Sequence, residues 1–176
     1  MTAPKHILPQ PHPSVLPTEE LEKQCAFGRG RSGGPGGQHR NKVETLVIVT
    51  HKPTDVHAQA GERRSAIENK RMALLRLRLA LAIDVRAELP AGDVRSDLWR
   101  TRSKGGRIAC SERHHDFPAV LAEALDMLWA CRADHKKAAI RLEVTPSQLI
   151  KLLKKHPPAF ARLNEWREAW GMAPVR

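Results

Sequence analysis

The sequence has no tyrosine, and aromatic residues make up only 4% of its 176 positions. It has three cysteines, Cys25, Cys110 and Cys131. This odd, widely spaced set excludes a disulfide framework and fits a reducing compartment. No stretch approaches the roughly 20 apolar residues that a membrane-spanning helix needs, and residues 1–22 lack the apolar core of a signal peptide. We therefore expect a soluble, cytoplasmic protein.

Acidic residues are also scarce. The chain has 19 Asp and Glu against 30 Lys and Arg, which gives a net charge of +11. An excess of this size predicts a polyanionic partner. Nucleic acid is favoured over a membrane surface, because the sequence has no strongly basic amphipathic helix with an aromatic face.

The length allows one generous domain or two small ones. Residues 1–17 hold five of the thirteen prolines, and we expect them to form a loose arm. The stretch LPAGD at 89–93 is typical of a boundary. The predicted organisation is an arm over 1–17, a first domain over 18–90 and a second domain over 94–176.

The first domain should be α+β. A weak strand is expected over 20–27, a clear β-branched strand over 43–51 and an antiparallel partner over 56–61. A helix over 65–89 begins at the capping residue Ser65, with Glu68 completing a capping box. Its apolar residues Ile67, Leu74, Leu77 and Leu81 share one face, which should pack under the small antiparallel sheet.

The second domain should be small and mainly helical. It opens with a basic hairpin that turns at residues 104–106, and helices follow from Pro118 onward. The stretch AAIRLEVTPSQLIKLLKK resembles a helix-turn-helix, in which Thr145 caps the second helix and Pro146 occupies its first position. A last helix should end at Gly171.

The glycine-rich stretch 28–42 admits three interpretations. A P-loop requires Lys-Ser or Lys-Thr after its glycines, and the stretch has neither. A dinucleotide fingerprint matches only through Gly28, Gly30 and Gly33, without the expected strand–helix–strand unit. A flexible linker would seldom carry Gln-His-Arg-Asn-Lys directly before a strand.

The chemistry of this stretch lies in its backbone. Gly36 and Gly37 permit a left-handed backbone and a close approach to another surface. Gln38 then presents an amide and a backbone N–H at the tip, among basic residues suited to an anionic cavity. Because the stretch supplies no strong general base, we expect catalysis to come mainly from positioning a water molecule as the nucleophile.

The stretch GPGGQHRNKVET resembles the GGQ motif of the class I peptide-chain release factors, and above all the small stand-alone ribosome-rescue hydrolases. The resemblance covers about residues 20–85. It implies an extended loop that enters the peptidyl transferase centre, where Gln38 is the catalytic tip set by the turn at Gly36 and Gly37. Asn41 and Lys42 would anchor the base of the loop. The motif departs from the family pattern at Gly33, an additional glycine, and at Arg40, where an apolar residue is usual.

The resemblance further implies ribosome-dependent hydrolysis of the peptidyl-tRNA ester. The chain has no room for codon-reading domains, so we expect codon-independent release on stalled ribosomes or split large subunits. The expected partners are large-subunit rRNA and peptidyl-tRNA, with no cofactor and a monomer off the ribosome. The alternative is a non-catalytic ribosome- or RNA-binding protein that uses the helix-turn-helix-like domain. A DNA-binding regulator is a weaker third option.

Basic residues of the loop, the long helix, the hairpin and the helix-turn-helix are candidate RNA contacts. They are Arg29, Arg31, Arg40, Arg71, Arg78, Arg102, Lys104, Arg107, Lys151, Lys154 and Lys155. Cys110, His114, Cys131 and His135 raise the alternative of a zinc site, but their spacing fits no common zinc module, so no metal is expected. The four tryptophans are expected to be core or capping residues.

Overall fold

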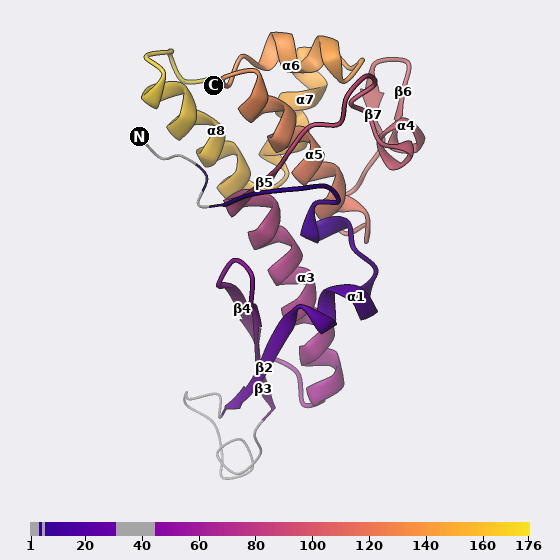
Figure 1. Cartoon of the computed structure of the whole chain (residues 1–176), viewed down its shortest axis with the longest axis vertical. Helices are drawn as coiled ribbons and strands as arrows, with labels where there is room; N and C mark the ends of the chain where they lie inside the picture. The colour runs from indigo at the N-terminus through magenta and orange to yellow at the C-terminus, as the bar shows by residue number, and fades with distance from the viewer. Residues whose placement is uncertain (1–3, 5, 31–44) are drawn as a thin grey trace.

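The computed structural model describes residue 4 and residues 6–30 and 45–176. The molecule is elongated, with a sheet and one long helix at one end and a cluster of helices at the other (Figure 1). Each end has its own hydrophobic core. The fold is α+β, as the sequence predicts, with a small antiparallel sheet followed by a mainly helical part.

The sheet has three antiparallel strands in the order β2 (Cys25–Gly30), β3 (Leu46–His51) and β4 (Val56–Ala60). Val47 and Val49 on β3 are buried, because alternate side chains of the strand face the core. The strand predicted over 43–51 is confirmed from Leu46 to His51, with residues 43–44 outside the described part of the chain, and the partner predicted over 56–61 is confirmed as β4. The strand expected over 20–27 starts only at Cys25, since the preceding residues form helix α1 (Thr18–Lys23).

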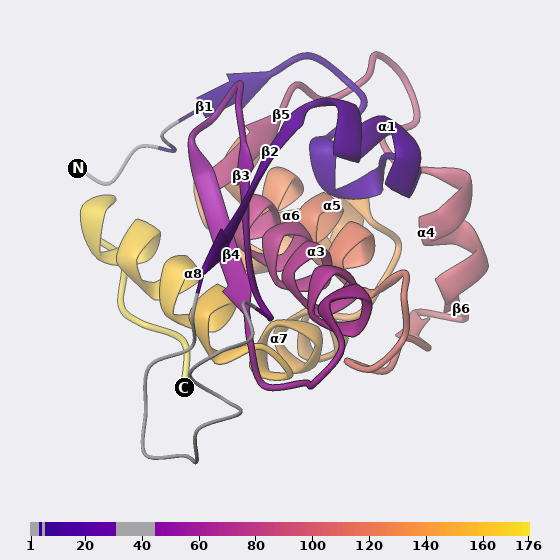
Figure 2. The ribbon, with the colours of Figure 1, turned by 90° about the horizontal axis from the view of Figure 1, so that it is seen from below.

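Helix α3 (Ala66–Asp84) covers one face of the sheet, as seen from below in Figure 2. Ser65 is its N-cap and accepts a hydrogen bond from the Glu68 N–H, as predicted. Leu74, Leu77 and Leu81 are buried against the sheet. Ile67 was expected on this face but is 68% exposed. It lies in the first turn of the helix, before the core begins at Met72 and Ala73.

The arm is not loose where the structure describes it, which corrects the expectation from its prolines. Strand β1 (His6–Leu8) pairs in parallel with β5 (Val85–Ala87), and the short 3₁₀ helix η1 (Pro13–Val15) follows. His12 is buried, and its Nε2 lies 3.1 Å from the carbonyl oxygen of Val85. Helix α3 was predicted to reach residue 89 but ends at Asp84. It ends there because Val85–Ala87 are extended and pair with β1 as strand β5.

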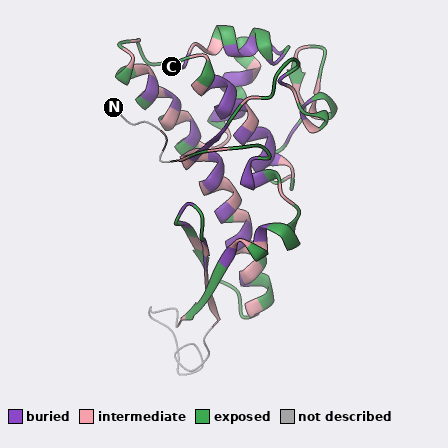
Figure 3. Ribbon diagram, viewed as in Figure 1, coloured by how far each residue is buried: buried purple, intermediate pink, exposed green. Residues whose placement is uncertain are grey.

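The second core is built around α5 (Phe117–Ala130), which is buried on nearly every side (Figure 3). Around it lie the helices and the two-stranded hairpin of the C-terminal half. These are α4 (Asp97–Arg102), β6 (Ser103–Lys104), β7 (Arg107–Ile108), α6 (His135–Arg141), α7 (Pro146–Lys154) and α8 (Pro157–Ala169). The basic hairpin, the helix pair capped by Thr145 and the last helix are thus confirmed, and α4 is an additional element.

A buried ion pair joins the two halves. Arg86 on β5 donates to Asp126 on α5 at 2.9 Å, and both side chains are almost fully buried. The Ala87 N–H donates to the same carboxylate oxygen at 3.1 Å. Because one partner alone would be an uncompensated buried charge, this pair fixes how β5 sits on α5. No helix in the described part of the chain is long and apolar enough to span a membrane.

Candidate functional site

The predicted catalytic and anchoring residues lie outside the described part of the chain. They are Gly36, Gly37, Gln38, Asn41 and Lys42, together with Gly33, Arg31 and Arg40. The structure does describe what flanks them. Gly30 ends β2 and pairs with Leu46, the first residue of β3. The segment with the GGQ motif therefore connects two neighbouring antiparallel strands.

The strand end is closely packed around Leu46. A Cβ at Gly30 would lie 3.2 Å from Cδ2 of Leu46. A Cβ at Gly61, just beyond β4, would lie 2.9 Å from Cδ1 and 3.4 Å from Cα of the same leucine. Two glycines thus let the backbone close around Leu46, and a side chain at position 61 would force the leucine to move.

Asn69 on α3 ties this strand end to the helix. Its side chain is fully buried and makes three hydrogen bonds. The amide nitrogen donates to the carbonyl oxygens of Thr45 at 2.7 Å and Arg63 at 2.9 Å, and the amide oxygen accepts from the Arg63 N–H at 2.9 Å. Both polar atoms of the buried side-chain amide thus have backbone partners.

Sequence reasoning missed Asn69. A signal was present, because Asn69 precedes the buried Ala73 by four residues and so lies on the apolar face of the helix. A polar residue on a buried face needs partners, and here they are backbone groups of Thr45, at the loop base, and of Arg63, in the turn before α3. The sequence alone could not show which backbone groups those are.

Two predicted RNA contacts lie free on the surface near this end. Arg29 on β2 and Arg71 on α3 are exposed and have no ion pair within the residues that the structure describes. By contrast, the neighbouring Lys70 forms an ion pair with Glu22 at 2.7 Å and lies over the ring of Phe27. Free guanidinium groups are suited to phosphate contacts.

Three predicted RNA contacts already have intramolecular partners. Arg78 donates to the Ser14 carbonyl oxygen at 2.8 Å, and burial lowers its pKa. Arg102 donates to Asp116 at 2.7 Å. Lys155 donates to the carbonyl oxygen of Cys110. These bonds restrict how each of the three side chains can turn toward an RNA phosphate.

The hairpin and α7 form one continuous surface. The Thr145 N–H donates to the Gly106 carbonyl oxygen at 3.0 Å, and the Ile108 N–H lies 3.4 Å from Oε1 of Gln148. The remaining predicted contacts on these elements are exposed. They are Lys104, Arg107, Lys151 and Lys154. We call these four residues the hairpin–α7 surface.

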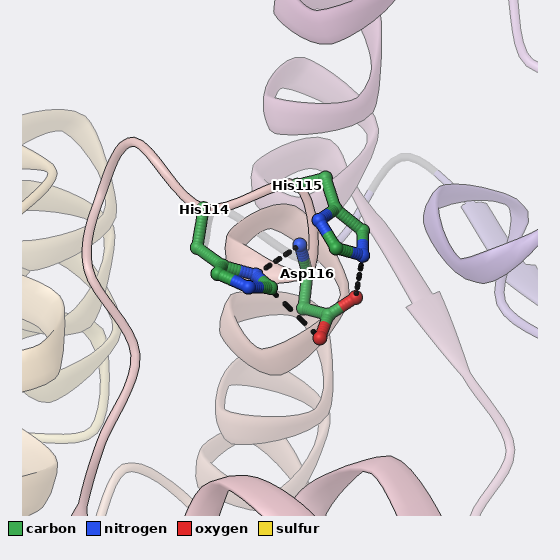
Figure 4. Close-up of side chains that lie close together, drawn as sticks. All are labelled: His114, His115 and Asp116. Atoms are coloured by element: carbon green, nitrogen blue, oxygen red, sulfur yellow. Dashed lines mark hydrogen bonds and ion pairs between the residues drawn. The ribbon is translucent and has the colours of Figure 1, made fainter.

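The four residues considered as zinc ligands do not converge. Among the described residues, the one group of three possible ligands within 4.8 Å is His114, His115 and Asp116 (Figure 4). The guanidinium of Arg102 lies 3.0 Å from Nε2 of His114 and 2.7 Å from the Asp116 carboxylate. Because a cation already occupies this position, the cluster is an ion-pair network rather than a metal site.

A family model described as the RF-1 domain matches residues 16–114. The chain belongs to the RF-1 domain family. The matched span includes the GGQ tripeptide, the strand end around Leu46, Asn69, all of α3 and the basic hairpin.

Curated relatives of this RF-1 domain protein carry release-factor names. It is 39% identical over 90 residues to peptide chain release factor 1 of Streptomyces avermitilis, covering 50% of this chain and 24% of that protein. It is 44% identical over 68 residues to the chloroplastic peptide chain release factor PrfB1 of Arabidopsis thaliana, covering 39% and 14%. It is 39% identical over 108 residues to peptide chain release factor 1 of Chlorobaculum tepidum, covering 61% and 30%. The chain thus spans less than a third of these relatives, and no solved structure matches it.

Proposed function

We propose that this RF-1 domain protein hydrolyses the ester of peptidyl-tRNA in the peptidyl transferase centre of the ribosome. The observation that carries the proposal is the Gly36-Gly37-Gln38 tripeptide inside the matched family span. Curated relatives that match 50–61% of the chain are named peptide chain release factor 1. The net charge of +11 supports a partner made of RNA.

In the proposed reaction, a water molecule positioned by the loop would attack the ester carbonyl of peptidyl-tRNA. The two glycines let the backbone turn where side chains would clash, so that the N–H of Gln38 can face the oxyanion of the tetrahedral intermediate. The Gln38 side chain would help hold the attacking water. Since the tripeptide supplies no strong base, orientation contributes most of the rate enhancement. Asn41 and Lys42 are proposed to anchor the loop, and Asn69 to hold its base.

We further propose that release is codon-independent and serves stalled ribosomes or split large subunits. Beyond the matched span the chain folds into α5 to α8, of which α5 and α8 pack against α3. Helix α7 supplies Lys151 and Lys154, two of the four residues of the hairpin–α7 surface. The positive charge of this surface is suited to binding rRNA. Residues 18–90 would then act as the catalytic domain and residues 94–176 as the recognition domain.

Peptide release from ribosome–nascent-chain complexes tests the catalytic assignment. Gln38→Ala removes the side-chain amide but keeps the backbone N–H, so we expect a partial loss of activity. Gly36→Ala and Gly37→Ala disturb the turn itself, and we expect a larger loss. Unchanged release by all three variants, with unchanged ribosome binding, would overturn the assignment.

The hairpin–α7 surface favours a second candidate, a non-catalytic RNA-binding protein that binds ribosomes. This candidate predicts wild-type binding to large subunits without any release of the nascent peptide. The same release assay therefore separates the two functions, since only the hydrolase produces free peptide.

A further inference from the structure

A cavity lies on the surface of the C-terminal half, where α5 leads into α6. It has a volume of about 440 Å³ and is lined by Ala130, Cys131, Arg132, Lys137, Ile140 and Arg141. Helix α6 lies at the opposite end of the long axis from the open ends of β2 and β3 (Figure 1). The cavity is therefore separate from the loop base.

The lining carries three cations and no acidic side chain. Two acids lie nearby in sequence, and both have other roles. Asp134 caps α6 by accepting from the N–H groups of Lys136 and Lys137, and its carboxylate is 3.9 Å from Nζ of Lys137. Glu143 forms an ion pair with Arg95. The positive potential of Arg132 and Arg141 in the cavity is thus opposed by no ion pair among the described residues.

The wall that bears Arg132 is fixed by hydrogen bonds. Arg132 and Ala133 both have positive φ angles, 51° and 57°, and form a tight turn after α5. The Ala133 N–H donates to the Leu128 carbonyl oxygen at 2.7 Å, and its own carbonyl accepts from Arg167 of α8 at 2.8 Å. A turn held from both sides fixes the backbone from which Arg132 projects, so binding does not have to order this segment of the chain.

An apolar side chain completes the cavity. Ile140 is 75% exposed, and it lies between the two cations of its own helix, Lys137 and Arg141. An exposed isoleucine beside guanidinium groups matches the two parts of a nucleotide, a charged phosphate and the apolar face of a base.

We propose that this cavity binds one nucleotide of a single-stranded RNA segment. Arg132, Lys137 and Arg141 hold the phosphate, and Ile140 contacts the sugar or base. An acidic peptide is the less favoured ligand, because the lining offers a single exposed apolar anchor, Ile140, beside three cations. The inference goes beyond the proposed hydrolase, since it adds an RNA contact far from the catalytic loop and requires no hydrolytic activity.

Cys131 provides a local reporter of occupancy. It lines the cavity and is half-buried, whereas Cys25 and Cys110 are buried and their pKa values are raised by desolvation. A neutral alkylating reagent such as iodoacetamide should therefore modify Cys131 first. The full-length protein would be alkylated with and without a single-stranded RNA of about 10 nucleotides, and the modified cysteine identified by mass spectrometry.

We expect the RNA to slow alkylation of Cys131 severalfold, and a polyglutamate peptide of equal charge to slow it far less. In Arg132→Gln/Arg141→Gln the protection by RNA should disappear. The slope of log affinity against log salt should become shallower by about 0.7 for each phosphate that the variant no longer neutralises. The control Lys23→Gln/Lys52→Gln removes two exposed charges elsewhere and should keep the protection.

Equal Cys131 alkylation with and without RNA would overturn the inference, as would stronger protection by polyglutamate than by RNA. Protection that persists in Arg132→Gln/Arg141→Gln would overturn it as well. Because the RNA is free of ribosomes, none of these outcomes depends on peptide release. Failure of this inference is therefore distinguishable from failure of the proposed hydrolase.

Discussion

Asn69 holds Thr45: its side-chain amide donates to the Thr45 carbonyl oxygen at 2.7 Å, from a position with no solvent exposure. Thr45 is the first described residue after the GGQ segment. The same amide group also bonds Arg63 in the turn before α3. One buried side chain thus joins the base of the candidate catalytic loop to the long helix that runs into the second core.

Asn69→Ala should destabilise the fold and reduce peptide release. Three hydrogen bonds disappear and the backbone groups of Thr45 and Arg63 lose these partners, so we expect a loss of about 2–4 kcal/mol in the free energy of unfolding. The matched control is Asn164→Ala, which removes two similar bonds to Val175 far from the loop. Urea unfolding measures the first effect. Release measured where both variants are fully folded should fall only for Asn69→Ala, as a change in kcat rather than KM.

If Asn69→Ala and Asn164→Ala release peptide at the same rate under those conditions, Asn69 has no positioning role. Asn69→Asp refines the test, since it keeps the acceptor for the Arg63 N–H but places a carboxylate against two carbonyl oxygens. We expect this variant to be no more active than Asn69→Ala.

Gly61→Ala should also disturb the loop base. Its Cβ would lie 2.9 Å from Cδ1 of Leu46, so the leucine must move. Gly28→Ala is the control within the same sheet, because its Cβ would meet Ile48 at an ordinary 3.7 Å. We expect the rate of peptide release to fall at least several-fold for Gly61→Ala and little for Gly28→Ala. The thermal stability of both variants is measured as well, so that release is compared only where both are folded. Equal activity of the two would show that close packing at Leu46 is unimportant for the loop.

The stability of the N-terminal arm should depend on pH through His12. Burial lowers the pKa of this histidine from 6.5 to about 3. Between these values the unfolded chain binds more protons than the folded one, so stability is present above pH 6.5 and is lost as the pH falls. We expect the difference in unfolding free energy between wild type and His12→Asn to shrink by about 1.5 kcal/mol from pH 6.5 to pH 5.

His57→Asn serves as the control for this measurement, because His57 is exposed on β4. Comparison with wild type at each pH cancels the contributions of other groups, such as Asp126, whose pKa is raised by burial. A pH-independent difference for His12→Asn would contradict the buried neutral histidine.

The hairpin–α7 surface should contribute to ribosome binding. Arg107→Gln/Lys151→Gln removes one charge from the hairpin and one from α7, and both side chains are exposed. We expect weaker binding to isolated large subunits and a shallower salt dependence. The control Lys23→Gln/Lys52→Gln changes the net charge equally, so a similar loss in both variants would mean that only total charge matters.

Local signals in the sequence predicted much of the fold. The β-branched run before His51, the capping box at Ser65 and the Thr145-Pro146 start of α7 are each confirmed. These features depend on neighbouring residues, so one segment is enough to reveal them. The tryptophans were also interpreted correctly: Trp99 and Trp166 are fully buried, and Trp129 packs edge-on against Trp166.

What the sequence did not reveal depends on partners distant along the chain. Strand β1 is ordered by pairing with β5, almost 80 residues away. That partner cannot be seen in the local sequence, where the prolines of residues 1–17 suggested a loose arm. The role of Asn69 requires Thr45 to lie beside it. Arg78 and Arg102 resemble free RNA contacts until Ser14 and Asp116 are placed next to them.

Peptide release from ribosomes stalled on an mRNA without a stop codon tests the central claim most directly. Wild type would be compared with Gly37→Ala, and with Gly33→Ala as a control that changes a glycine outside the tripeptide. Our account predicts rapid release by wild type, near-wild-type release by Gly33→Ala, and loss of most release by Gly37→Ala despite normal ribosome binding. Release by Gly37→Ala at the wild-type rate, or no release by wild type on these complexes, would contradict it.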